Sequence, residues 1–153
     1  MVFEAADEYL LVDGYNILFA WDDLKELARQ NLDAARQSLM DILSNYQGFR
    51  QCAVILVFDA YKVHHTGEVM RYHNIDVVYT KEAETADMYI EQATYKLSKN
   101  RRVRVATSDG MEQLIILGHG ALRVSARTFR QEVEQANGEI AAIMQRHNSA
   151  KKW

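Results

Sequence analysis

Residues 52–59 of the chain read Cys-Ala-Val-Ile-Leu-Val-Phe-Asp, an unbroken apolar run that ends directly at an aspartate. A run without alternating polar residues is typical of a strand that is buried on both faces of a sheet. Shorter apolar runs lie at residues 9–12, 75–79 and 103–106, with a brief one near 121–122. Together these runs predict the strands of a mainly parallel sheet.

Helical patterns alternate with the apolar runs. We expect helices over residues 24–46, 84–97 and 109–117, and a last helix that begins after the cap residue Ser125. This alternation predicts an α/β fold of three layers, with a sheet of about five strands covered on both faces. In such sheets ligands bind outside the carboxyl ends of the strands, so the functional residues are expected there.

The composition fits one domain. The chain has 153 residues, of which 48% are hydrophobic, and it contains no proline and seven glycines, so no flexible linker divides it. We assign residues 1–8 to a lead-in or linker remnant, 9–147 to the domain and 148–153 to a flexible tail.

The cysteine content, the apolar runs and the net charge indicate the compartment and the kind of partner. The single cysteine, Cys52, lies in the apolar run, so we expect it to be buried, and a reducing cytoplasm suits the chain. No apolar run approaches the roughly 18–20 residues that span a bilayer, so no membrane segment is expected. The net charge of −3 argues against broad binding to polyanions. If nucleic acid is the substrate, positive charge has to be local and a bound cation has to offset the acids.

Four aspartates lie at, or just beyond, the ends of predicted strands. Asp13 follows the first strand, Asp59 the second and Asp109 the fourth, while Asp87 lies in the first turn of the helix after the third. A parallel sheet aligns these ends, so the carboxylates can converge, and close carboxylates repel unless a cation lies between them. Carboxylate oxygens suit Mg²⁺ or Mn²⁺. The pattern therefore predicts a metal site that orients water against a phosphodiester.

Each aspartate also has an ordinary structural explanation. Asp87 and Asp109 can be acids that a helix dipole favours, and Asp13 before Gly14 can be a turn residue. Asp59 alone is a weak signal, because strand-end aspartates are common. Four aspartates at successive strand ends favour the metal site.

Five segments of the chain carry a more specific signal. They read Leu-Val-Asp-Gly-Tyr-Asn (11–16), Val-Phe-Asp-Ala (57–60), Thr-Lys-Glu-Ala-Glu-Thr-Ala-Asp (80–87), Ala-Thr-Ser-Asp (106–109) and Gly-His-Gly-Ala-Leu-Arg-Val-Ser-Ala-Arg (118–127). In this order they resemble the motif series of YacP-like NYN domains, which belong to the PIN-like nucleases. The resemblance implies an α/β/α core with an acidic metal site and the activity of a Mg²⁺- or Mn²⁺-dependent endoribonuclease.

The resemblance also implies residue roles. The residues that match the acids of the family, and are expected to hold the metal and its water, are Asp13, Asp59, Asp87 and Asp109. Asn16 matches the motif asparagine and is expected to orient Asp13 or to touch the substrate. Glu84, Ser108 and Glu112 are expected to support the site, the two glutamates through outer contacts to the metal.

The partners that the resemblance implies are RNA and the ribosome. The family includes an endonuclease that acts on messenger RNA at the ribosome. Similar domains occur at the C-terminus of translation GTPases that resemble ribosomal protection factors, and the lead-in at residues 1–8 would suit a domain from such a fusion. The sequence does not predict an oligomeric state.

Candidate RNA contacts lie near the same edge of the sheet. Arg123 and Arg127 flank the start of the last helix, where an arginine can hold a phosphate. Lys62 and His65 lie in the loop after the second strand, and Tyr15, just after the first aspartate, can stack on a base. For Lys62 and His65 the competing interpretation is an ordinary exposed loop.

Other classes fit less well. A noncatalytic module that keeps the fold and docks to RNA or the ribosome is the main alternative, and the intact acids argue against it. A haloacid-dehalogenase phosphatase expects D-x-D where this chain has Asp13-Gly-Tyr-Asn16, and the acids and lysine of a response-regulator receiver are not found. A nucleotide-binding Rossmann domain lacks both G-x-G-x-x-G and a P-loop here.

Overall fold

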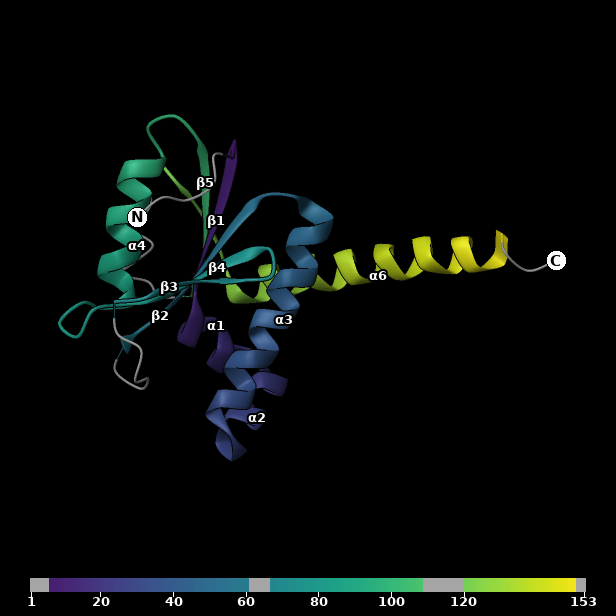
Figure 1. Ribbon diagram of the computed structural model, residues 1–153, viewed down its shortest axis with the longest axis horizontal. Coiled ribbons are helices and arrows are strands. Elements are labelled where there is room, and N and C mark those ends of the chain that lie inside the picture. Colours follow the sequence, from purple (N-terminus) through teal and green to yellow (C-terminus); the bar gives the residue numbers. More distant parts are fainter. Residues whose placement is uncertain (1–5, 61–66, 109–119, 151–153) are drawn as a thin grey trace.

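The computed structural model describes residues 6–60, 67–108 and 120–150 of the chain. In chain order (Figure 1) its elements are β1 (Glu8–Asp13), α1 (Gly14–Ala20), α2 (Asp22–Gln30), α3 (Leu32–Arg50), β2 (Ala53–Phe58), β3 (Val69–Tyr72), β4 (Ile75–Tyr79), α4 (Ala86–Leu97), β5 (Arg102–Ala106), β6 (Leu122–Val124) and α6 (Ala126–Ala150). The predicted α/β class is confirmed.

The sheet has six strands in the order β3-β4-β2-β1-β5-β6. β1 lies at its centre and pairs in parallel with β2 and β5, and β4 and β6 extend the parallel set on either side. β3 pairs antiparallel with β4. The prediction of a mainly parallel sheet is therefore confirmed, but the sequence analysis missed β3, whose residues are almost all exposed and carry no apolar run.

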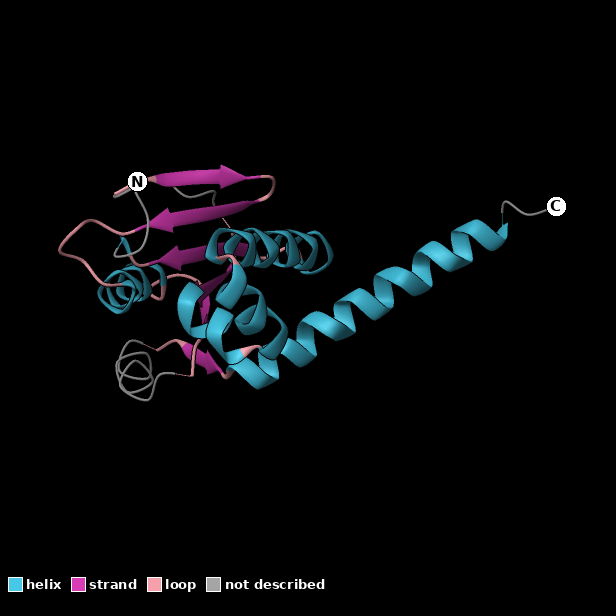
Figure 2. Ribbon diagram, turned by 90° about the horizontal axis from the view of Figure 1, so that it is seen from below, coloured by secondary structure: helices cyan, strands magenta, loops and turns pink. Residues whose placement is uncertain are grey.

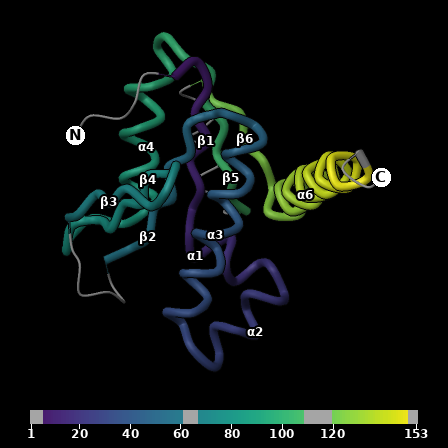
Figure 3. Tube along the Cα trace, turned by 45° about the vertical axis from the view of Figure 1, so that its right-hand side comes forward, coloured from purple at the N-terminus to yellow at the C-terminus, as the bar shows by residue number. Residues whose placement is uncertain are grey.

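Helices cover both faces of the sheet, as three layers require. Alternate residues of β1 face opposite ways: Leu10 and Val12 join the apolar cluster under α1, α2, α3 and the first turns of α6, whereas Tyr9 and Leu11 join the cluster under α4. Of the helices that the structure describes, Figures 1 and 3 show α4 on one side of the sheet and the others on the opposite side. Cys52 belongs to the first cluster, which confirms its predicted burial.

The first helical region differs from its prediction. Residues 24–46 were expected to form one helix, but α2 ends at Gln30 and α3 starts at Leu32. The reason is Asn31, which has extended backbone geometry and whose side chain accepts a hydrogen bond from Ala34 N at 3.1 Å, so it caps a new helix. The short helix α1 was also missed, and the helix expected over residues 109–117 lies outside the described residues.

The last helix, α6, leaves the body of the molecule. Phe129, Val133 and Ala136 are buried, but every residue from 141 to 149 is exposed. Figure 2 shows this half of α6 projecting away from the sheet. The helix continues to Ala150, two residues past the start of the tail expected at residues 148–153. Among the described residues, no helix is both long and apolar enough to cross a membrane.

Candidate active site

The carboxyl ends of β1, β2 and β5 meet at one edge of the sheet. Asp13, the last residue of β1, pairs with Val57 of β2, and Asp59 lies two residues further along that strand's path. On the other side, Thr107 directly follows β5, and its hydroxyl donates to Asp13 Oδ2 at 3.4 Å. The ends of β1 and β2 therefore place Asp13 and Asp59 at the same edge of the sheet.

Asp13 is held in an unusual way for an aspartate at a helix start. It is the N-cap residue of α1, yet its side chain makes no capping hydrogen bond. An N-cap aspartate ordinarily accepts from a backbone N–H in the first turn. Its carboxylate is instead directed to the sheet edge, where the residue is only 7% exposed. Helix capping therefore does not explain why an aspartate stands here.

Gly14 allows α1 to begin hard against β2. A Cβ atom at this position would lie 2.5 Å from two ring carbons of Phe58 and 2.8 Å from the carbonyl oxygen of Val57. Only a residue without a side chain fits at that distance. The close approach keeps Asp13, immediately before the glycine, next to the strand end that carries Asp59.

Asp59 and Asp87 are linked through the start of α4. Asp59 Oδ1 accepts a hydrogen bond of 2.6 Å from the backbone N–H of Ala86, the residue before Asp87. Thr85 caps the same helix, since its side chain accepts from Met88 N at 3.1 Å. The strand-end acid therefore fixes the first turn of α4, and Asp87 lies half-buried in that turn.

The turn between β4 and α4 is held by its own side chains. The Thr80 hydroxyl accepts from Ala60 N at 3.0 Å and donates to the Glu84 carbonyl at 2.8 Å. Glu84 Oε1 accepts from Lys81 N at 3.5 Å. Glu84 thus folds back on the turn, and its predicted outer contact to a metal stays a prediction.

A chain of hydrogen bonds runs from α1 to α6 through the end of β5. Asn16 Oδ1 accepts from Ser108 N at 2.7 Å, and Ser108 Oγ accepts from Ala126 N at 3.2 Å. The Ala126 carbonyl in turn accepts from Trp21 Nε1 at 2.9 Å. Asn16 and Ser108 therefore join α1, the end of β5 and α6, and their support of a metal site stays a prediction.

Tyr15 lies beside the acids with a buried arginine behind it. Its ring packs on Phe58 at 5.0 Å between centroids, and its hydroxyl accepts from Arg36 Nη1 at 3.1 Å. Burial raises the pKa of Tyr15, Arg36 opposes the rise, and the negative charge of Asp59 adds to it. The sequence analysis missed Arg36, which is 7% exposed and also pairs with Asp33. The sequence does contain a sign of it, because Arg36 is a cation directly beside the apolar residues that form the buried face of α3.

Four predicted site residues, Asp109, Glu112, Lys62 and His65, lie outside the described residues. Within the described ranges, no three acidic, histidine or cysteine side chains gather closely enough to hold a metal ion. The donors that are described, Asp13 from β1 with Asp59 and Asp87 on the adjoining side, have the oxygen chemistry that Mg²⁺ and Mn²⁺ prefer. Their chemistry suits such an ion, and their role as its ligands stays a prediction.

The two predicted arginines differ in setting. Arg123 is half-buried in β6, and its Nε atom is buried without a hydrogen-bond partner among the described residues. Arg127 is exposed in the first turn of α6, near Ser108 in the wall of one pocket. Only Arg127 is therefore presented openly at the surface.

The chain is similar in sequence and in fold to known proteins. Residues 10–153 match the family model of the YacP-like NYN domain. The uncharacterized protein YacP of Bacillus subtilis (strain 168) is 40% identical over 145 residues, which cover 94% of this chain and 85% of that protein. A crystal structure of Rae1 (YacP) from Bacillus subtilis superposes with a TM-score of 0.81 at 40% identity, covering 94% of this chain and 83% of that one. A mutant of the same protein gives a TM-score of 0.82 at 39% identity, with 93% and 84% covered.

Proposed function

The chain belongs to the family of YacP-like NYN domains, and from that premise we propose that it is a metal-dependent endoribonuclease that hydrolyses phosphodiester bonds of RNA. NYN domains are PIN-like nucleases, so a nuclease is the expected class. The Mg²⁺ or Mn²⁺ requirement, the internal cleavage and the RNA target are the parts that we propose.

The observation that carries the proposal is the state of Asp13. This acid is almost fully buried at the end of the central strand, and its side chain is not used to cap the helix that it begins. Burying a carboxylate costs free energy unless a cation or hydrogen-bond donors compensate it. A metal ion at the sheet edge would add to the compensation that the Thr107 hydroxyl already gives Asp13 Oδ2.

The protein's own residues would position the reaction. Asp13, Asp59, Asp87 and, by its motif, Asp109 would hold the ion, which supplies a polarised water and stabilises charge on the phosphate. The hydrogen bond from Ala86 N to Asp59 Oδ1 fixes one of these carboxylates before substrate binds. Thr107 does the same for Asp13. Fixed ligands reduce the reorganisation that the transition state requires.

Partners and setting are part of the proposal. RNA is the expected substrate of the family, and messenger RNA presented by the ribosome is the specific form that we propose. The cytoplasm is the matching compartment, since Cys52 is a buried free thiol.

The test combines metal binding with cleavage. Mn²⁺ titration by calorimetry and cleavage of RNA, with and without translating ribosomes, would be measured for wild type, Asp13→Asn and Asp87→Asn. Glu139→Gln is the control, because it removes one negative charge from the exposed half of α6. We expect both site variants to lose at least about a hundredfold in rate and to bind Mn²⁺ more weakly, with the control unchanged.

Two results would contradict the proposal. Cleavage that persists in both aspartate variants would remove the acids from the reaction. A wild-type chain that binds ribosomes but neither binds Mn²⁺ nor cleaves RNA would be a noncatalytic docking module.

A further inference from the structure

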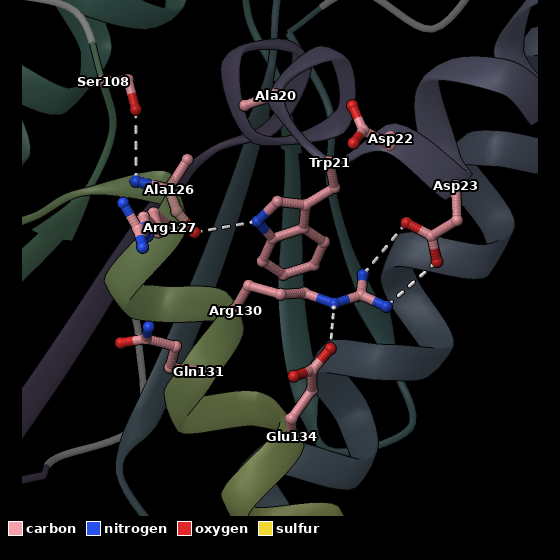
Figure 4. A pocket seen from close by; sticks show the side chains of 10 residues that line it. All are labelled: Ala20, Trp21, Asp22, Asp23, Ser108, Ala126, Arg127, Arg130, Gln131 and Glu134. Atoms are coloured by element: carbon pink, nitrogen blue, oxygen red, sulfur yellow. Dashed lines mark hydrogen bonds and ion pairs between the residues drawn. The ribbon is translucent and has the colours of Figure 1, made fainter.

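A pocket of about 690 Å³ lies beside the acidic edge, between the α1–α2 corner and the first turns of α6. Figure 4 shows that α1 and α2 supply one wall, α6 the other, and Ser108 the border toward the sheet. Sites for small ligands commonly have volumes of roughly 300–1,000 Å³. The pocket is therefore large enough to take one unit of a polymer chain.

Side-chain contacts join the walls of the pocket. Trp21 Nε1 donates to the Ala126 carbonyl at 2.9 Å, and the Arg130 guanidinium lies 4.7 Å from the indole centroid. Arg130 also bonds Asp23 at 3.2 and 3.0 Å and Glu134 at 3.2 Å, as Figure 4 shows. Two carboxylates thus occupy Arg130. It fastens α2 to α6 and is not available to a ligand.

Other polar groups in the pocket are not occupied in this way. Arg127, Gln131 and Asp22 line it and have no hydrogen-bond or ion-pair partner among residues 6–60, 67–108 and 120–150. Arg127 and Gln131 stand one turn apart on α6, so they share a face of the helix. Ser108 Oγ accepts from Ala126 N, which leaves its own proton to donate. The pocket thus offers a cation, an amide, a carboxylate and a hydroxyl.

The pocket is connected to the acidic edge through neighbouring residues and their hydrogen bonds. Ser108 borders it, and its neighbour Thr107 donates to Asp13. Ser108 N donates to Asn16 at 2.7 Å. An RNA strand that crosses Asp13 can therefore place a neighbouring nucleotide in the pocket, because Ser108 lines the pocket and the adjacent Thr107 donates to Asp13.

We propose that this pocket is a nucleotide subsite, which takes the nucleotide next to the cleaved bond of single-stranded RNA. The inference rests on the proposed function. Arg127 holds the phosphate of that nucleotide, with Ser108 as a second donor. Asp22 and Gln131 read the edge of the base. A carboxylate accepts hydrogen bonds from exocyclic amino groups, so the pocket favours adenine, cytosine or guanine over uracil.

The first test measures RNA binding without cleavage, so that it stays separate from the fate of the nuclease proposal. Fluorescence anisotropy with single-stranded oligonucleotides, in the absence of divalent metal, would compare wild type, Arg127→Gln and Arg146→Gln. Arg146 is the matched control, because it is exposed on the projecting half of the same helix. We expect Arg127→Gln to weaken binding by about tenfold and to reduce the slope of log K against log salt by about 0.7, as for one lost phosphate contact.

The second test addresses the base. Binding of oligonucleotides that differ at one position would be compared for wild type and Asp22→Asn. Because an asparagine side chain can donate as well as accept, the variant is expected to lose the discrimination against uracil. Equal losses for Arg127→Gln and Arg146→Gln would overturn the subsite, as would base preferences that Asp22→Asn leaves unchanged. A chain that binds ribosomes but no oligonucleotide would also overturn it.

Discussion

Replacing Gly14 with alanine tests the close approach of α1 to β2. The added Cβ would lie 2.5 Å from two carbons of the Phe58 ring, whereas non-bonded carbons prefer about 3.5–4.0 Å. The ring has no room to swing, because Phe58 is fully buried between two other rings. Its centroid lies 5.0 Å from that of the tilted Tyr15 ring, and it stacks on Tyr79 at 5.9 Å. The helix itself has to move.

The expected cost is the difference between two effects. Overpacking a core typically costs about 1–3 kcal/mol, and occasionally more. Alanine also stabilises a helix by roughly 0.5–1 kcal/mol relative to glycine, because glycine loses more conformational entropy when it enters a helix. For Gly14→Ala we expect a net loss of about 1–2 kcal/mol in the free energy of unfolding. In a chain of this size that lowers Tm by roughly 2–8 °C.

Activity is expected to fall further than stability. Gly14 separates Asp13 from the helix that carries Asn16, so a shift of α1 displaces both side chains. A misplacement of about 1 Å can cost on the order of a hundredfold in rate. RNA cleavage under conditions where the variant is fully folded would measure this loss separately from unfolding.

Gly138→Ala is the matched control. Gly138 is exposed within α6, and a Cβ there meets no atom within 4 Å. The same substitution is therefore expected to stabilise the protein by roughly 0.5–1 kcal/mol and to leave cleavage unchanged. Thermal unfolding of both variants provides the comparison. If Gly14→Ala gained stability as Gly138→Ala does, the steric explanation for Gly14 would be refuted.

Three further predictions concern stability. Thr85→Ala removes the acceptor for Met88 N and should cost about 1 kcal/mol in urea unfolding, and a cost near zero would show that the cap contributes nothing. Trp21→Phe leaves the Ala126 carbonyl without its indole donor and should cost roughly 1–3 kcal/mol, and a fully stable variant would argue against that bond. Burial raises the pKa of Tyr46 above its ordinary 10.0, so its contribution to stability is complete below that value and is lost as pH rises past it. Unfolding measured at about pH 8 and about pH 11 should show the loss, which Tyr46→Phe should reduce.

The sequence predicted most of the sheet because its central strands are uniformly apolar. Residues 52–58 could not sit at an exposed edge without leaving large apolar side chains in water, so a buried strand was the consistent interpretation. β3 could not be found in this way. It is an exposed edge strand that exists through its antiparallel pairing with β4, and its sequence Val-Met-Arg-Tyr has no repeat that separates it from a loop.

The placement of Asp13 and Asp59 at the strand ends was predictable from the sequence, but the contacts between side chains around them were not. Strand-end aspartates are visible in the sequence because topology aligns strand ends. The contact of Arg36 with Tyr15 and that of Asn16 with Ser108 depend on how helices pack over the sheet, and no local pattern encodes a distance between such pairs. Asn31 is an ordinary polar residue in the sequence. It separates α2 from α3 because its backbone is extended, which the sequence does not show.

The central place of β1 has a consequence for synthesis of the protein. β1 is made before its neighbour β5, and Thr107, which donates to Asp13, follows that aspartate by 94 residues. Ala126, which completes the chain of bonds through Ser108, follows later still. A nascent chain therefore cannot assemble the site until nearly the whole domain has left the ribosome. A nuclease built in this order would gain its site only after Ala126 had been made.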